Sequence, residues 1–387
     1  MSKNSYDVII IGAGSIGNPT AFFLAEAGFK VLVLEQFASV GQGSNKAAIG
    51  GVRATHSDPA KIHLCLQSIE VFSTWEQRYG DHIGWVQGGY SFVAYRDKEE
   101  QALKELLTIQ KEYGLHIDWL DKDMLLEVIP SLNPEGLRGG TYSPHDGSAS
   151  PLLAAAAFYR MAVKHKVHYH FQEHVTAFET KGNRLLSVQT DKGRYTADVF
   201  INAAGPWARD VSQMAKVDVP VTPDSHEAGV TEAVARFLTP MVVDIRPTVD
   251  SANYYFYQHD TGQLIFCITP HPAVWGTDRR ETSVFLPQIA RRMVNLIPRL
   301  QYLKVRRTWR GLYPMTPDGV PIVGKLPQLE NFIFAVGMCG QGFMLGPGVG
   351  KVLTRLLKNE LDRQDHRILD DLRPGRNFGG RGQEKLA

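Results

Sequence analysis

Near the start of the chain, apolar residues form two short unbroken runs separated by a helical pattern. The runs Val8–Ile11 and Val31–Leu34 consist entirely of valine, isoleucine and leucine, which is typical of strands buried on both faces of a parallel sheet. Between them, residues 21–27 predict a helix that ends at Gly28. The order strand, helix, strand indicates a βαβ unit over residues 8–35.

A G-x-G-x-x-G motif, Gly12–Gly17, joins the first strand to the helix. Gly12 permits the tight turn, Gly14 lets the backbone approach a pyrophosphate, and Gly17 lets the helix pack close to the strand. Glu35 ends the second strand, where a carboxylate can accept hydrogen bonds from a ribose. These features together predict a dinucleotide site, whose helix N-terminus offers N–H groups to the anion. An ordinary βαβ unit with a glycine turn is the alternative interpretation.

The segment Gly41–Arg53 contains too many glycines for a continuous helix. Ser44 and Asn45 can donate hydrogen bonds to phosphate, and Gly50-Gly51 would let the backbone run beneath a flat ring system. A plain surface loop is the alternative interpretation.

Farther along, hydrophobic patterning changes twice, and both changes indicate insertions. Residues 90–95 predict a strand, 97–113 an amphipathic helix, and Asp58-Pro59 the start of another helix. We expect a loop from Gly139 to Ser150, and a helix starting at Pro151. Residues 217–305 are rich in aromatic β-formers, whereas the segment after Arg373 is rich in glycine and arginine and predicts a loosely held tail.

Composition excludes several classes of protein. At 387 residues and 43% hydrophobic, the chain can form a large core in two domains. A net charge of +2 gives no reason to expect nucleic acid or an acidic membrane surface as a partner, and no apolar run has the length of a membrane span. The first residues contain no signal-peptide pattern, and the three cysteines have neither metal nor disulfide spacing. We therefore expect a cytoplasmic protein.

Four histidines, at positions 165, 168, 170 and 174, fall close together in sequence. Because His168 and His170 have no carboxylate or cysteine partner on their strand face, we interpret them as structural or solvated and predict no metal site.

Three further segments extend the opening motif into a family pattern. They are Asn202–Trp207, which ends a buried strand, Thr316–Gly324, and the glycine-rich run Gly337–Gly350 before a final helix. In this order they resemble the D-amino-acid-oxidase-like flavoproteins, most closely the β subunits of sarcosine oxidase and L-proline dehydrogenase. The resemblance implies FAD and an α/β fold. A discontinuous Rossmann-like FAD-binding domain (1–87, 139–216 and 306–370) would carry a substrate domain rich in mixed β-sheet (88–138 and 217–305), followed by a tail (371–387).

The resemblance also implies which residues contact the cofactor. The ADP half, the phosphates and the flavin would be held by residues that match family positions: Gly12, Gly14, Ser15, Ile16, Gly17, Glu35, Gln36, Ser44, Asn45, Gly50, Gly51, Val175, Ala203, Ala204, Gly205, Trp207, Gly337, Gly340, Gln341, Gly342, Phe343 and Met344.

Three departures from family members refine this expectation. The cysteine that binds flavin covalently in monomeric sarcosine oxidase aligns with Gly311, so we predict dissociable, non-covalent FAD. The lysine that such oxidases hold above the ring aligns with Phe266-Cys267, so reduction of O2, which develops negative charge, should be slow. In glycine oxidase, the arginine that binds the substrate carboxylate aligns with Tyr313, so either another residue holds the carboxylate or the substrate is not a simple amino acid.

The activity implied is oxidation of the C–N bond of a small primary or secondary amino acid (sarcosine, proline or glycine) to an imine, by hydride transfer to flavin N5. A dehydrogenase is favoured over an oxidase. The candidate catalytic and substrate-binding residues are Arg53, His56, Tyr255, Tyr257, His271 and Tyr313. A pyrophosphate contact or a surface salt bridge is the alternative for Arg53, an exposed position for His56, and core packing for the two tyrosines at 255 and 257.

Two other hypotheses remain open from the sequence. The chain could be a flavin-carrying subunit with an electron-relay or structural role in a larger complex. It could also bind NAD through the N-terminal motif, as a nicotinamide-dependent dehydrogenase.

Overall fold

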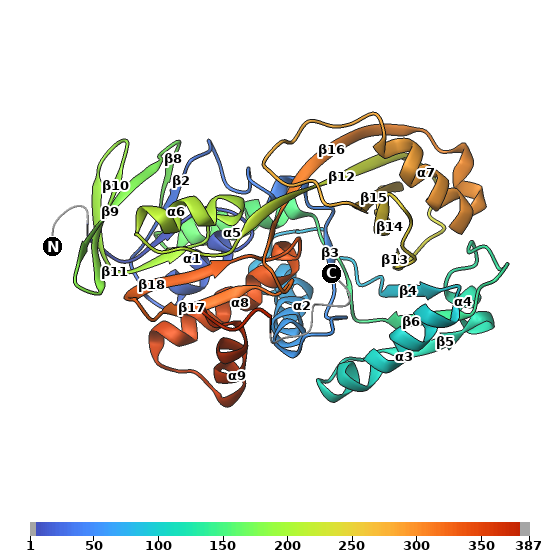
Figure 1. The fold of residues 1–387 in the computed structure, drawn as a ribbon, viewed down its shortest axis with the longest axis horizontal. Coiled ribbons are helices and arrows are strands. Elements are labelled where there is room, and N and C mark those ends of the chain that lie inside the picture. The colour runs from blue at the N-terminus through green and yellow to red at the C-terminus, as the bar shows by residue number, and fades with distance from the viewer. Residues whose placement is uncertain (1–4, 380–387) are drawn as a thin grey trace.

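The computed structural model describes residues 5–379, which form two large sheets lying side by side (Figure 1). The first sheet has a parallel centre, β18-β11-β1-β2-β8, and β17 adds antiparallel to β18. A hairpin of β9 and β10 extends from β11. The strands are β1 (Ser5–Ile11), β2 (Val31–Glu35), β8 (His168–Phe171), β9 (Val175–Lys181), β10 (Arg184–Thr190), β11 (Arg194–Asn202), β17 (Ile322–Leu326) and β18 (Leu329–Val336).

Helices cover both faces of this sheet, which is why the runs Val8–Ile11 and Val31–Leu34 in its central strands are entirely apolar. On one face, α1, α2, α5 and α8 pack through a core that contains Phe22, Trp75 and Phe158. On the other face, α6 packs near Phe200. The helices are α1 (Gly17–Glu26), α2 (Pro59–Tyr79), α5 (Pro151–Lys164), α6 (Ala208–Met214), α8 (Gly342–Lys358) and α9 (Arg363–Leu372).

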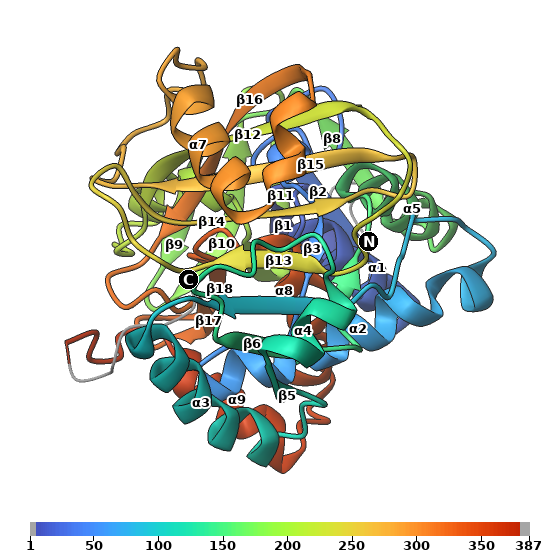
Figure 2. The same ribbon diagram turned by 90° about the vertical axis from the view of Figure 1, so that its right-hand side faces the viewer.

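The second sheet has the order β16-β12-β15-β14-β13-β4-β6-β5, which Figure 2 shows nearly face-on. Its outer face packs on α4, α7 and the turn Pro298–Tyr302, and α3 packs at the β4–β6 end. Its elements are β4 (Tyr90–Ala94), β5 (Asp118–Asp121), β6 (Gly139–Ser143), β12 (Thr222–Ala233), β13 (Met241–Asp244), β14 (Ser251–Gln258), β15 (Gln263–Pro270), β16 (Val305–Met315), α3 (Asp97–Glu112), α4 (Lys122–Val128) and α7 (Phe285–Leu296).

Short elements connect the two sheets. β3 (Gly51–Val52) pairs with β7 (Gly147–Ser148), and two 3-10 turns, Asn45–Ala47 and Gly205–Trp207, lie between the sheets. The mixed α/β fold expected from the sequence is confirmed.

The structure differs from the sequence expectations for two strands, β6 and β16. The segment from Gly139, expected to be a loop, forms β6, whose glycines fit because Cβ atoms there would meet the carbonyl oxygens of Leu120 and Phe92 at 2.3 and 2.6 Å. β16, assigned from residue 306 to the cofactor domain, instead pairs with β12 along its whole length. Both strands therefore belong to the second sheet.

The expectation of a loose tail after Arg373 is wrong for residues 374–379. Arg376 is 6% exposed and forms an ion pair with Asp318, and it also donates to the carbonyls of Val320 and Pro321. Composition did not indicate this because the partners lie more than 50 residues away in sequence. The rest of the expected tail, residues 380–387, lies outside the described residues.

The remaining structural expectations concern metals and membranes. His168 and His170 form hydrogen bonds with the hydroxyls of Tyr6 and Tyr195. Over residues 5–379, no group of three or more His, Cys, Asp or Glu side chains is placed to hold a metal ion. Within the same range, no helix combines the length and the apolar character needed to cross a bilayer.

Candidate active site

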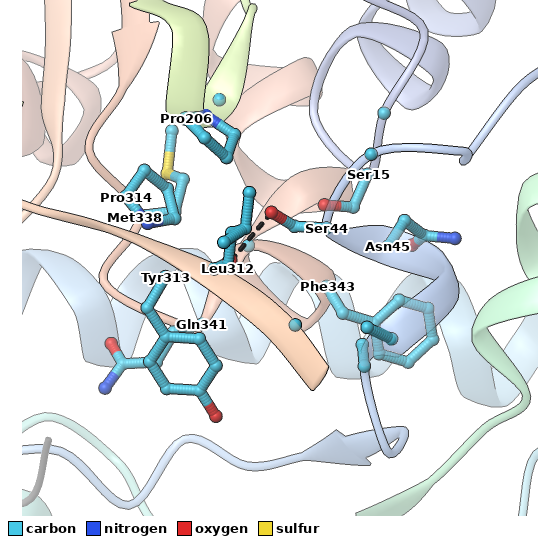
Figure 3. A pocket seen from close by; sticks show the side chains of 18 of the residues that line it. Ser15, Ser44, Asn45, Pro206, Leu312, Tyr313, Pro314, Met338, Gln341 and Phe343 are labelled. Atoms are coloured by element: carbon cyan, nitrogen blue, oxygen red, sulfur yellow. Dashed lines mark hydrogen bonds between the residues drawn. The ribbon is translucent and has the colours of Figure 1, made fainter. Parts of the chain in front are cut away.

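A cavity of about 580 Å³ lies between the two sheets and is the main feature of the site. Its walls come from segments far apart in sequence: the turn after β1, the loop 43–51, the residues after β11, and the start of α8. Figure 3 shows Ser15, Ser44, Pro206 and Gln341 around it. The inner face of the second sheet closes the other side, so the cavity joins the nucleotide-binding motif to an aromatic chamber.

The opening turn has the geometry that its glycines predict. Gly12 has φ +105°, and a Cβ atom there would lie 2.6 Å from the carbonyl oxygen of Ala203 on the neighbouring segment. A Cβ atom at Gly17 would lie 1.9 Å from the carbonyl oxygen of Gly12. At Gly14 the same test finds no atom within 4 Å, so the turn leaves open space where an anion approaches the first N–H groups of α1.

Glu35 is held at the end of β2 by two backbone N–H groups. Ala13 donates to Oε2 at 2.7 Å and Phe37 donates to Oε1 at 2.9 Å. Burial raises the pKa of Glu35, and these backbone hydrogen bonds oppose the rise. The carboxylate lines the cavity beside Gln36 and Val175, so its remaining lone pairs can accept from ribose hydroxyls.

α8 begins at the cavity and packs closely on the first turn of α1. Gly342, Gly346 and Gly350 recur every four residues, and Cβ atoms at these positions would lie 3.1, 1.9 and 3.1 Å from Ser15 Oγ, Ser15 O and Thr20 N. The residues at the start of α8 line the same cavity as Gly14, Ser15 and Ile16, which precede α1.

Gln341, which precedes α8, has a buried side chain that lines the cavity. Neither Nε2 nor Oε1 has a hydrogen-bond partner among the described residues. A buried amide without partners is costly, so both atoms suit a ligand with donors and acceptors, such as a flavin pyrimidine ring.

Two loop residues use their side chains differently from the phosphate contacts that the sequence suggested. The Ser44 hydroxyl donates to the carbonyl of Leu312 at 2.7 Å, drawn as a dashed line in Figure 3. The Asn45 amide donates to the carbonyl of Pro151 at 2.9 Å. Both residues still line the cavity, and these bonds fix the loop between the two sheets.

Of the other residues expected to contact cofactor, most line the cavity, and two shape the backbone instead. Gly17 forms the close contact described above. Gly337 has φ +69°, and a Cβ atom there would lie 2.3 Å from Cγ2 of Thr316. Those that line it are Gly12, Gly14, Ser15, Ile16, Gln36, Gly50, Gly51, Val175, Ala203, Ala204, Gly205, Trp207, Gly340, Gly342, Phe343 and Met344.

In the chamber, Tyr255 and Tyr313 approach from β14 and β16 with their hydroxyl oxygens 2.6 Å apart. Cys267 lies beside them, with its Sγ 4.0 Å from the Tyr313 hydroxyl. Burial raises the pKa values of both tyrosines well above 10 and that of Cys267 to about 11. All three groups are therefore neutral hydrogen-bonding groups at neutral pH.

Arg53 supplies a buried cation to the same chamber. It is 7% exposed and lines the cavity, with its guanidinium carbon 5.9 and 5.3 Å from the ring centroids of Tyr90 and Phe92. One of its nitrogens lies 3.2 Å from Nδ1 of His56. A guanidinium fixed among aromatic rings suits a carboxylate ligand.

Three of the six substrate candidates lie away from the cavity lining. His56 is fully buried between Arg53 and Cys65, not exposed as the sequence suggested. Tyr257 donates its hydroxyl to the carbonyl of Ile49 at 2.7 Å and so supports the loop. His271 is exposed directly after β15 and is not among the residues that line the cavity.

The sequence interpretation missed His226 on β12. Its imidazole lines the cavity, stacks on the Tyr313 ring at 3.8 Å between centroids, and is hydrogen-bonded to Asp224. The i, i+2 spacing of Asp224 and His226 places both on one strand face, which was the available signal.

The residues present fit a flavin dinucleotide on three counts: the open space at Gly14, the two helix N-termini, and the unpartnered amide of Gln341. The sequence profile of the family described as FAD dependent oxidoreductase (DAO) matches residues 7–356. The chain belongs to this family. It is therefore an FAD-dependent oxidoreductase, and the resemblance to this family inferred from the sequence motifs is confirmed. The closer likeness to the β subunits of sarcosine oxidase and L-proline dehydrogenase stays a prediction.

Individual relatives cover the chain almost completely. Glycine oxidase from Geobacillus kaustophilus (strain HTA426) is 28% identical over 364 residues, 92% of this chain and 93% of that protein. Mitochondrial sarcosine dehydrogenase from Mus musculus is 26% identical over 375 residues, and the chain spans only 40% of its length. The crystal structure of L-proline dehydrogenase from P. horikoshii superposes with a TM-score of 0.88 at 27% identity, over 96% of this chain and all of that chain.

Proposed function

We propose that the protein oxidises the C–N bond of a small primary or secondary amino acid to an imine, with FAD as the hydride acceptor. The observation that carries the proposal is the single cavity that joins the Gly12–Gly17 turn to a chamber holding Arg53, Tyr255 and Tyr313. Relatives named glycine oxidase, sarcosine dehydrogenase and dimethylglycine dehydrogenase support this substrate class.

The chain's own residues would hold the cofactor from both ends. Glu35 would accept from the adenosine ribose next to Val175, and the N-terminus of α1 would bind the pyrophosphate. The N-terminus of α8 and Gln341 would contact the pyrimidine end, where a positive helix end favours an anion. Bound FAD supplies the acceptor for the hydride that leaves the α-carbon.

The chamber would orient the amino acid. The Arg53 guanidinium suits the carboxylate, and the Tyr255 and Tyr313 hydroxyls can exchange their mutual bond for bonds to the same ligand. Hydride transfer requires the α C–H bond of the substrate to be aligned with the flavin, and the aromatic side chains of the chamber would fix that alignment.

The test is an anaerobic screen of sarcosine, proline, hydroxyproline, glycine and D-amino acids against purified holoprotein. The expected result is bleaching of the flavin absorbance by at least one of these amines. Flavin that stays oxidised with all of them would contradict the proposal. A purified protein without a yellow chromophore that binds NAD would favour the nicotinamide hypothesis instead.

We further propose that the enzyme is a dehydrogenase rather than an O2-using oxidase. Cys267 lines the chamber, and no lysine among the described residues lines the cavity. Developing superoxide would therefore lack the lysine ammonium that such oxidases hold above the ring, while the Arg53 guanidinium would be occupied by the substrate carboxylate. Slow reoxidation of the reduced flavin by O2 in a stopped-flow experiment is expected, and fast reoxidation would overturn this assignment.

We propose that FAD is bound without a covalent bond. At Gly311, the position of the covalent cysteine in a relative, a Cβ atom would lie 2.8 Å from Cβ of Ala47, so this site has no space for a side chain. Acid precipitation should release all of the FAD into the supernatant. Yellow colour retained in the pellet would contradict this prediction.

A role as a flavin-carrying subunit is the second candidate. The hydrogen cyanide synthase subunit HcnC of Pseudomonas aeruginosa is 25% identical over 400 residues, 92% of this chain and 94% of that protein. If the chain is such a subunit, it would show no amine oxidation when purified alone and would oxidise amines when co-expressed with its partner subunits.

A further inference from the structure

His226 is held in one orientation by two contacts. Its Nε2 lies 3.0 Å from Oδ2 of Asp224, and its ring stacks on Tyr313 with 20° between the planes. Asp224 and His226 are only 5% and 4% exposed, so this pair is buried in the chamber wall.

The surroundings of Asp224 determine which nitrogen of His226 carries the proton. Its Oδ1 accepts from the backbone N–H groups of Ser225 and Val274, at 2.8 and 2.7 Å. Burial acts to raise the pKa of Asp224, but the hydrogen bonds from His226 and these N–H groups hold it below its usual range. A carboxylate that only accepts requires hydrogen on Nε2, which leaves Nδ1 as the basic nitrogen of the neutral ring.

Nδ1 of His226 is buried and has no hydrogen-bond partner among the described residues. An unpaired polar atom inside a protein costs about 1–3 kcal/mol, so its presence in a chamber wall calls for a partner that arrives with the ligand. His226 is one of the residues that line the cavity, so this unpaired nitrogen belongs to a side chain of the chamber wall.

We propose that His226 accepts the proton that an ammonium substrate must lose before its C–H bond can be broken as a hydride. The inference rests on the proposed function. In this step one N–H bond of the substrate breaks, its electron pair stays on the amine nitrogen, and the proton binds Nδ1. No electron is transferred, and the imidazolium that forms is paired with the Asp224 carboxylate.

Other ionisable groups around His226 do not compete for this proton. Tyr313 and Tyr255 remain protonated because burial raises the pKa of each well above 10, and burial raises the pKa of Cys267 to about 11. Arg53 also lines the cavity, and its guanidinium offers only N–H donors and no acceptor. Histidine is the side chain whose charge ordinarily changes between pH 5 and 8.

The variant H226Q isolates the basic nitrogen. The Gln Nε2 can still donate to Asp224, but the amide offers no base in place of Nδ1. We expect anaerobic flavin reduction by the best amine of the screen to fall about 100-fold or more at pH 7. We also expect the rate to recover at high pH, following the free amine fraction of the substrate. A wild-type pH profile retained by H226Q would overturn the inference.

A ligand without an ammonium group separates proton transfer from shape. Methoxyacetate matches sarcosine in outline but has an ether oxygen in place of the amine, and its binding can be followed by perturbation of the flavin spectrum. H226Q should bind methoxyacetate as tightly as wild type, within about twofold. Loss of that binding would mean that His226 only maintains the chamber, and would overturn the inference.

H82Q is the matched control, because His82 is exposed and its ring is hydrogen-bonded to Glu76 on α2, away from the residues that line the cavity. It should behave as wild type, and FAD content and thermal unfolding confirm that each variant is folded. If no amine bleaches wild-type flavin at any pH, the proposed function fails and this inference with it. If wild type is bleached and H226Q shows the same rates and pH profile, only the inference fails.

Discussion

Gly346 lies so close to Ser15 that a Cβ atom at position 346 would stand 1.9 Å from the Ser15 carbonyl oxygen. Through this contact, a helix near the end of the chain packs on the first turn of the βαβ unit at its beginning. Both helix N-termini thereby reach one cavity. This close packing explains how the glycine-rich segment Gly337–Gly350 contributes to a site that also contains the N-terminal motif Gly12–Gly17.

Substituting alanine for Gly346 and for Gly14 should therefore affect stability and FAD binding differently. G346A forces a methyl group against backbone, so we expect about 1–3 kcal/mol of lost unfolding free energy together with weaker FAD binding. G14A places its methyl group in open space on the anion's side of the turn. It should leave the apoprotein's stability within about 0.5 kcal/mol of wild type while weakening FAD binding. Denaturant unfolding of apoprotein and FAD titration measure both, and equal stability losses would contradict the assignment.

Neighbouring tyrosines on β14 provide a matched test of the chamber. Tyr255 faces Tyr313 in the cavity, whereas Tyr254 points to the other face and donates to the carbonyl of Arg292 at 3.0 Å. Y255F should lower kcat/KM about 3- to 10-fold, the value of one hydrogen bond of about 1 kcal/mol. Y254F should affect thermal stability but leave kcat/KM unchanged. The assignment of the chamber is wrong if the two variants behave in the opposite way.

Arg53 should be needed for affinity toward the substrate carboxylate. R53Q removes the charge and should raise the KM for the amino acid about 10- to 100-fold, because a hydrogen bond to a charged group contributes about 1.5–3 kcal/mol. R53K keeps the charge but loses the planar fork, so it should recover part of this loss. Steady-state kinetics on variants with full FAD content checks the order, and an unchanged KM in R53Q would exclude carboxylate binding by Arg53.

The Asp318–Arg376 ion pair should make stability depend on acid pH. Burial acts to raise the pKa of Asp318, but hydrogen bonds from Arg376 hold it below its usual range. Because the folded pKa is lower than the unfolded one, the stabilisation is complete above the unfolded value and is lost as pH falls through the folded value. D318N leaves a buried guanidinium unpaired and should cost about 3–5 kcal/mol at pH 7.

Urea unfolding between pH 3 and 7 measures this effect. The wild-type stability should decline toward pH 3 more steeply than that of D318N. The control D278N removes the exposed partner of Arg280 and should leave the unfolding midpoint unchanged. Equal midpoints for D318N and wild type would show that the C-terminal segment contributes nothing to the fold.

Local sequence rules predicted the βαβ unit because its strands, glycines and helix ends are determined by neighbours within about 35 residues. The Asp58 cap is another such case, since its side chain accepts from the backbone of Lys61. β6 was missed because Gly139 and Gly140 indicate a loop in isolation. Only the approach of two neighbouring strands explains why glycine is needed there.

The substrate residues depended on contacts that no local pattern reveals. Tyr255 and Tyr257 are two residues apart and therefore lie on the same face of β14. The Tyr257 hydroxyl nevertheless donates a hydrogen bond to the carbonyl of Ile49, 208 residues away in sequence. His56 was interpreted as exposed and lies buried behind Arg53. His226 was overlooked because its significance comes from an unpaired nitrogen, which becomes visible only once the strands pair.

The most direct test of the central claim is a crystal structure of the holoenzyme with methoxyacetate. The account predicts one FAD whose ribose contacts Glu35, whose pyrophosphate lies at Gly14, and whose ring separates the Gly50-Gly51 segment from the Tyr255–Tyr313 chamber. The ligand carboxylate should lie beside Arg53. A flavin bound outside this cavity, or methoxyacetate bound away from the chamber, would contradict the account.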